Sequence, residues 1–145
     1  ISIYDKEGNT KFIDKYFVYE SDYKKELKYI KELNNIKGFL ELVEYDDETL
    51  CIRTKYAGVP LTKENLPIDW EYQIRNIENI LLEKEIFHND IHSPYLTRHF
   101  FVKDDIITLI DFGLADKYSI HVGHSLLPMI QNNDFDGVIQ HIHSL

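Results

Sequence analysis

The chain has 145 residues, of which 43% are hydrophobic and 13% aromatic; this is enough apolar material for one core, and the length is too short for two independent domains. The formal net charge of −9, with Lys and Arg scattered along the chain, argues against a nucleic-acid-binding surface, which needs clustered positive charge. Cys51 is the single cysteine, so no internal disulfide can form, and no apolar run approaches the roughly 18 residues that span a bilayer; we expect a cytoplasmic protein with no membrane partner.

The first half of the chain predicts two β-hairpins around one helix. The β-prone segments are residues 1–4, 11–18, 39–45 and 50–56. The first pair flanks a turn that contains Gly8, and the second flanks an acidic turn and ends at Gly58, so we expect each pair to be antiparallel. Between the pairs, apolar residues recur every three or four positions over residues 21–33, behind Ser21 and Asp22, which can cap a helix start.

The second half predicts a helix, a third hairpin and a helical tail. Residues 69–84 place Trp70, Ile74 and Ile77 on one helical face. Residues 100–102 and 106–110 flank a polar turn. Residues 125–145 predict one or two short helices, interrupted near Asn132 and Asn133. This order of elements, with every strand pair joined by a short turn, gives an α+β fold class in a single domain.

Two acidic residues on two predicted loops suit phosphoryl transfer. Asp90 lies in the run Phe-His-Asn-Asp-Ile-His that starts at residue 87, and Asp111 lies in the run Ile-Asp-Phe-Gly-Leu-Ala that starts at residue 110. One carboxylate can accept or orient the proton of an attacking hydroxyl, and the other can hold a magnesium ion that bridges the phosphates of a nucleotide.

These two runs resemble the catalytic loop and the metal loop of the protein-kinase-like superfamily. His88-Asn89-Asp90 stands where that family has His-Arg-Asp, and Asp111-Phe112-Gly113 reproduces its metal-loop motif. The His-Asn-Asp variant is similar to choline and aminoglycoside kinases. The second run is similar to protein kinases and to the small kinases that accompany tRNA threonylcarbamoylation.

The resemblance covers roughly residues 10–118 and implies a truncated two-lobed kinase-like fold. The N-terminal lobe, about residues 1–56, would hold an antiparallel sheet and one helix. A hinge at about residues 55–60 would lead to a small helical C-terminal lobe at about residues 61–145.

The resemblance also implies roles for residues upstream. Lys15 is similar to the strand lysine that holds the α- and β-phosphates, with Lys11 as the competing choice on the same face. Glu26 is similar to the helix glutamate that pairs with that lysine, and we expect the ion pair within about 4 Å. Residues 54–58 resemble the hinge whose backbone receives adenine. The nucleotide is thus assigned to Ile13, Lys15, Lys55 and Ala57.

Two departures from the family's pattern bear on activity. No Gly-x-Gly-x-x-Gly loop precedes the predicted phosphate lysine, because Gly8 is the only glycine there. The family's metal-binding Asn corresponds to Tyr95 when counted forward from Asp90, and to His99 when counted backward from Asp111. We prefer the backward count, since the predicted hairpin fixes that spacing. An imidazole ligand should favour Mn²⁺ over Mg²⁺ relative to ordinary kinases.

The sequence therefore predicts an ATP-dependent phosphotransferase, a minimal atypical kinase in which Asp90 positions the hydroxyl of a protein Ser/Thr or of a small alcohol. Lys15 paired to Glu26 would steady ATP, and Asp111 with His99 would bind Mg²⁺. The alternative is an inactive pseudokinase that binds a nucleotide or a partner.

Shortened lobes also predict an exposed apolar surface, and such surfaces commonly mark interfaces. A homodimer or a stable protein partner is therefore favoured over a monomer. The residues of this surface are Trp70, Leu126, Leu127 and Ile130.

Overall fold

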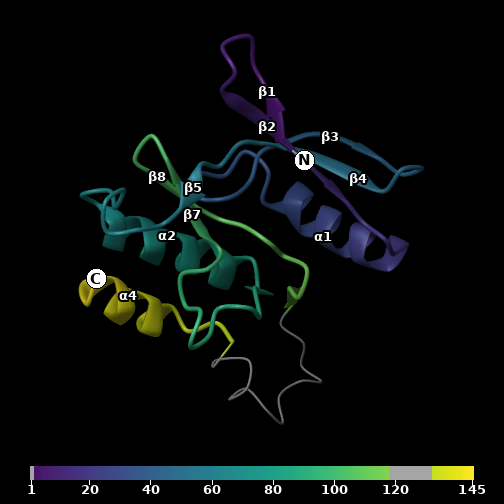
Figure 1. The fold of residues 1–145 in the computed structure, drawn as a ribbon. Helices are drawn as coiled ribbons and strands as arrows, with labels where there is room; N and C mark the ends of the chain where they lie inside the picture. The colour runs from purple at the N-terminus through teal and green to yellow at the C-terminus, as the bar shows by residue number, and fades with distance from the viewer. Residues whose placement is uncertain (1, 118–131) are drawn as a thin grey trace.

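The computed structural model describes residues 2–117 and 132–145. Over these ranges, three helices combine with short antiparallel sheets, which confirms the α+β class (Figure 1). A four-stranded sheet with helix α1 forms one part of the molecule, and helices α2 and α4 with a β-hairpin form the other. Within the described ranges, no helix is both long enough and apolar enough to cross a bilayer.

The four-stranded sheet has the order β1-β2-β4-β3, and its neighbours are antiparallel. Both predicted hairpins are present. The strands are β1 (Ser2–Tyr4), β2 (Thr10–Tyr16), β3 (Leu42–Asp46) and β4 (Cys51–Lys55). The second hairpin begins later than predicted, because Phe39 makes an isolated bridge to Leu109 and packs with its ring 6.2 Å from that of Phe112. Phe39 thus belongs to the core shared with the C-terminal part.

Helix α1 (Glu20–Glu32) packs under this sheet through Leu27 and Ile30, which contact Ile52 of β4. The predicted cap at Ser21 and Asp22 is wrong. The helix begins earlier, its N-cap residue is Tyr19, and no side chain caps it. Two acidic residues, Glu20 and Asp22, lie in the first turn instead, where the helix dipole favours negative charge.

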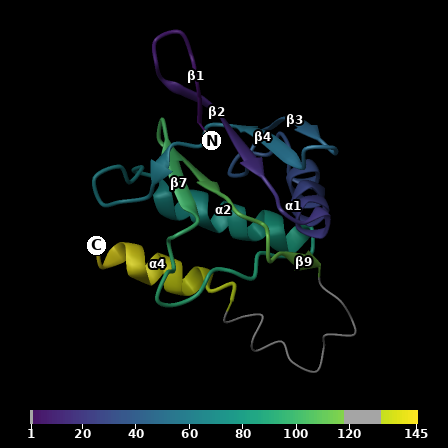
Figure 2. The same cartoon turned by 45° about the vertical axis from the view of Figure 1, so that its right-hand side comes forward.

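The C-terminal part is built on α2 (Trp70–Glu83), which lies between the β7–β8 hairpin and α4, as the two views show (Figures 1 and 2). Its apolar face is buried through Ile74 and Ile77, at 0% and 1% exposure. The remaining elements are β7 (Phe100–Lys103), β8 (Ile106–Leu109), α4 (Phe135–His143) and the two-residue strands β5 (Val59–Pro60), β6 (Ile86–Phe87) and β9 (Asp116–Lys117). The predicted helix and third hairpin are confirmed.

The tail enters α4 through a turn at Asn132 and Asn133, near the predicted interruption, and Asp134 caps the helix by accepting a hydrogen bond from Gly137 N at 2.8 Å. Trp70, predicted to lie on an exposed apolar surface, is partly buried, with its ring 5.0 Å from that of His143. The other residues predicted for that surface, Leu126, Leu127 and Ile130, lie outside the described residues.

Candidate functional site

A cavity of about 270 Å³ lies between the four-stranded sheet and the β7–β8 hairpin. Its size is close to the lower end of small-ligand pockets, roughly 300–1,000 Å³. Of the two lysines considered from the sequence, Lys15 lines the cavity and Lys11 does not. The lining includes every residue assigned above to the nucleotide, namely Ile13, Lys15, Lys55 and Ala57. Glu26 and Asp111 also line the cavity.

The predicted ion pair between β2 and α1 is present at one end of this cavity. Lys15 Nζ donates a hydrogen bond to Glu26 Oε1 at 3.1 Å and lies 2.8 Å from Oε2. Glu26 is 2% exposed, and its burial raises the pKa of the carboxyl above the usual value, although the hydrogen bond and the charge of Lys15 oppose this. Lys15 Nζ also lies 3.8 Å from Asp111 Oδ1, so the lysine links the helix to the second loop.

The end of β4 and the segment that follows it also line the cavity. The Lys55 ammonium is paired with Glu41 at 2.8 Å. Ala57 contributes backbone N–H and C=O groups that form no hydrogen bond with the part of the chain that the structure describes. Gly58 has φ +100°, and a Cβ there would overlap the carbonyl of Val102, so this close approach requires glycine.

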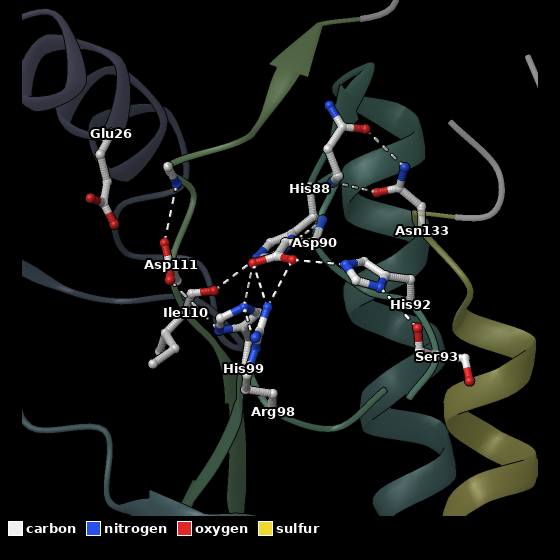
Figure 3. Close-up of polar contacts among 12 residues, drawn as sticks. Glu26, His88, Asp90, His92, Ser93, Arg98, His99, Ile110, Asp111 and Asn133 are labelled. Carbon is white, nitrogen blue, oxygen red and sulfur yellow. Dashed lines mark hydrogen bonds and ion pairs between the residues drawn. The ribbon is translucent and has the colours of Figure 1, made fainter. Parts of the chain in front are cut away.

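Asp90 lies at the centre of a hydrogen-bonded cluster just beyond the cavity (Figure 3). Its Oδ1 accepts from Arg98 Nη2 at 2.9 Å and from His92 Nε2 at 3.1 Å; its Oδ2 accepts from the same Nη2 at 3.0 Å and from His99 Nε2 at 2.7 Å. Burial alone would raise the pKa of Asp90, but the hydrogen bond and charge of His99 and the charge of Arg98 outweigh it and hold the pKa below its usual value. Asp90 is therefore a carboxylate at neutral pH.

His99 bridges the two acidic residues, as the backward count predicts. Its Nε2 lies 2.7 Å from Asp90 Oδ2, and its Nδ1 lies 3.8 Å from Asp111 Oδ2. Arg98 Nε also points at Nε2, at 3.3 Å, and this contact would need a proton-free Nε2. The shorter contact to a carboxylate decides the tautomer, so Nε2 carries the proton and Nδ1 turns its lone pair toward Asp111. Tyr95, the residue given by the forward count, is 58% exposed.

The cluster of Asp90, His99 and Asp111 has the donor set for a divalent cation. Each residue offers one ligand atom, and these atoms all lie within 4.8 Å of one another. Two carboxylates with one imidazole suit Mg²⁺, Mn²⁺ and similar ions. The residues that would hold the ion are Asp111 and His99 through Nδ1, because Asp90 already accepts hydrogen bonds at both of its oxygens.

Backbone geometry fixes the two loops. Asn89 and Asp111 have φ of 70° and 62°, in the left-handed region that non-glycine residues seldom adopt outside special sites. His88 connects the loops: its Nε2 donates to the carbonyl of Ile110 at 2.8 Å, and its Nδ1 accepts from Asp90 N at 3.2 Å. Its full burial lowers the pKa of the imidazole to about 4, so the ring is neutral and structural.

The segment before α4 holds the first loop from the other side. Asn133 Oδ1 accepts from Asn89 N at 2.9 Å, and its Nδ2 donates to Asn89 Oδ1 at 3.2 Å. Ile91 N donates to the carbonyl of Asn132 at 2.7 Å, and Asp134 N donates to the carbonyl of Ile91 at 3.0 Å. The backbone on both sides of Asp90 is therefore anchored.

Sequence reasoning missed the contacts that three residues make at this site: His92, Arg98 and Asn133. His92 and Arg98 lie close to Asp90 along the chain, but no periodicity or motif shows that their side chains turn back to it. Asn133 is far away in sequence and stood out only as an interruption in a helical pattern. No protein-family model matches this chain, and no curated protein sequence matches it significantly.

Proposed function

We propose that the protein is an ATP-dependent phosphotransferase with the layout of a minimal kinase. One observation carries the proposal: a single cavity runs from the free backbone of Ala57, past the Lys15–Glu26 pair, to Asp111, which adjoins Asp90 through His99. Adenine would meet Ala57, and the phosphates would reach the Lys15 ammonium. Asp90 then lies where a hydroxyl would approach the terminal phosphate.

In this proposal the acceptor hydroxyl oxygen attacks the γ-phosphorus of ATP. The bond between the γ-phosphorus and the β,γ-bridging oxygen breaks, and ADP leaves with the electron pair. Asp90 takes the hydroxyl proton, while Lys15 neutralises phosphate charge. His92 and His99 hold the Asp90 carboxylate in one orientation, which lowers the entropy cost of reaching the reactive geometry.

Asp111 and His99 are the residues that would hold a divalent cation. Such an ion neutralises charge on the phosphates. The Asp90 carboxylate orients the His99 ring by accepting a hydrogen bond from its Nε2, so the ring presents Nδ1 to the ion. An Nδ1 ligand supports Mn²⁺ better than Mg²⁺.

A nucleotide-binding module that transfers no phosphate is the second candidate function. The β1–β2 hairpin favours this function, because Gly8 is the single glycine at its tip. The hairpin therefore lacks the repeated glycines that let kinase loops approach phosphates closely. In this case ATP would still bind in the cavity, but neither the unaltered protein nor an Asp90 variant would transfer phosphate.

Three variants separate these functions. We expect Lys15→Met to weaken Mn·ATP binding by roughly tenfold or more, because a charge-assisted contact to phosphate is lost. Asp90→Asn should keep binding and lose transfer by roughly a hundredfold or more, as for loss of a general base. His99→Asn should move the metal preference toward Mg²⁺. Binding is measured by calorimetry with a non-hydrolysable ATP analogue, and transfer with [γ-³²P]ATP.

Lys11→Met is the matched control, because Lys11 lies on the same strand but does not line the cavity. It should leave both binding and transfer unchanged. Binding without any transfer in the unaltered protein would support the second candidate. Equal loss of binding in the Lys11 and Lys15 variants would contradict the placement of ATP in the cavity.

A further inference from the structure

The Asp90 carboxylate is fully occupied by groups of its own chain. A carboxylate offers about four lone-pair positions on its two oxygens. In this structure each oxygen accepts two hydrogen bonds, one from Arg98 Nη2 and one from an imidazole, His92 on Oδ1 and His99 on Oδ2. A hydroxyl that is to give its proton to Asp90 must therefore displace one of these donors.

Arg98 is the donor that can leave. Its side chain is 46% exposed, whereas that of His99 is 10% exposed and makes the shortest of the contacts to Asp90, at 2.7 Å. His92 is 37% exposed, less than Arg98, and contacts one Asp90 oxygen where Arg98 contacts both. Arg98 also occupies both Asp90 oxygens, so its departure opens both at once.

We propose that Arg98 is the acceptor-recognition residue of this site and that the acceptor carries an anionic group, a carboxylate or a phosphate, close to its reactive hydroxyl. The inference rests on the proposed phosphotransferase function and names its substrate class. A guanidinium that leaves one carboxylate is best satisfied by another carboxylate or by a phosphate, both of which match its planar fork. An anionic acceptor replaces the Asp90 contact, while a neutral alcohol leaves Arg98 in competition for Asp90.

The surroundings of Arg98 fit this role. Its Nη1 forms no hydrogen bond or ion pair with the residues that the structure describes, so this nitrogen can donate to an anion before any exchange occurs. The ring of Tyr95 lies 5.3 Å from the guanidinium carbon and supports the flat face of the group. The guanidinium can then turn toward an incoming anion without losing this stacking partner.

The test compares acceptors that differ in charge alone. The small pair is glycerate and its amide, glyceramide, and the peptide pair is a blocked Glu-Ser-Glu and a blocked Gln-Ser-Gln; the two pairs distinguish a free acid from an acidic peptide as the source of the anion. Transfer is measured with [γ-³²P]ATP and Mn²⁺ for the unaltered protein and for Arg98→Gln. We expect the unaltered protein to prefer an anionic acceptor by roughly tenfold or more in kcat/KM, a preference that a charged pair can provide.

In Arg98→Gln the preference for the anionic acceptor should disappear, through opposite changes for the two kinds of acceptor. The kcat/KM for the anionic acceptor should fall by roughly tenfold, and that for the neutral acceptor should rise, because Asp90 is no longer occupied. Arg75→Gln is the matched control, because Arg75 also contacts two carboxylates, those of Glu78 and Asp136, but lies on α2 outside the site. The acceptor preference of this variant should equal that of the unaltered protein.

A second readout does not depend on transfer. Glycerate is titrated into the protein loaded with a non-hydrolysable ATP analogue, and the Arg98 Nε–H resonance is followed by NMR. Saturable shifts that are absent in Arg98→Gln support the proposal. No shift, or an unchanged acceptor preference in Arg98→Gln, overturns it. Absence of transfer to all four acceptors would contradict the proposed function, and the titration would then decide on Arg98 by itself.

Discussion

At the scale of single residues, His88 makes the two loops of the site depend on pH. The neutral ring donates from Nε2 and accepts at Nδ1, and a second proton would abolish the acceptor that faces Asp90 N. Burial lowers the pKa of His88 to about 4, below the ordinary value of 6.5. Between these values the unfolded chain binds a proton that the folded chain does not, so acid favours unfolding.

We predict that the contribution of His88 to the free energy of unfolding is complete above pH 6.5 and falls by about 3 kcal/mol as the pH decreases through the interval down to 4, which corresponds to the lowering of the His88 pKa. Urea unfolding followed by circular dichroism at several pH values measures this slope. His88→Gln should lose most of it. His141→Gln is the control and should keep it, because His141 lies on α4 away from both loops. An equal slope in the His88 variant would contradict this account.

At the scale of elements, the turn before α4 acts on the first loop without lining the cavity. Asn133 contributes an acceptor and a donor to Asn89, next to Asp90. We predict that Asn133→Ala lowers kcat by roughly tenfold with little change in ATP affinity, because leaving partly buried partners unsatisfied costs about 1–3 kcal/mol and loosens the loop. Steady-state kinetics with ATP varied measures both quantities.

Two further variants give this prediction its controls. Asn133→Asp retains an acceptor for Asn89 N and should recover part of kcat, which a general loss of folding would not allow. Asn132→Ala should behave like the unaltered protein, because Asn132 contributes its backbone carbonyl to Ile91 rather than its side chain. A large rise in KM for ATP in Asn133→Ala would instead place its effect in the cavity.

Elements with enough residues to show a period could be predicted from the sequence. Helix α2 extends over Trp70–Glu83, close to the predicted 69–84, because its apolar face spans several turns. The strands β5, β6 and β9 have two residues each, too few for an alternation, and they exist because tertiary packing brings them beside partners. The start of α1 was misplaced because its first turn relies on acidic residues rather than a capping side chain.

The candidate site was predictable where chain order fixes geometry. Lys15 and Glu26 lie on an adjacent strand and helix, and His99 is placed beside Asp111 by the β7–β8 hairpin, whose length the turn determines. The left-handed backbone of Asp111 and the contacts of Arg98 depend on how two loops meet. Such contacts leave no local pattern, because the residues involved share neither a strand nor a helix face.

At the scale of the whole molecule, a chain of net charge −9 has to admit an anionic nucleotide. The cations at the site are already paired with acidic residues: Lys15 with Glu26, Lys55 with Glu41 and Arg98 with Asp90. Their attraction therefore acts mainly at short range, whereas the excess negative charge repels an approaching anion from further away. Salt weakens the long-range part first, since the screening length falls from about 30 Å at 0.01 M to about 8 Å at 0.15 M.

We predict that the association rate constant of a fluorescent Mg·ATP analogue rises by roughly severalfold between 0.01 M and 0.15 M salt, because screening removes more repulsion than attraction. Stopped-flow fluorescence measures this rate. Fluorescent adenosine, which carries no phosphate, should associate at a rate that salt does not change, and this excludes an effect of salt on the fold. A rate that falls with salt would contradict this prediction, because the cations Lys15, Lys55 and Arg98 would then dominate the electrostatic field at the site despite the net charge of −9.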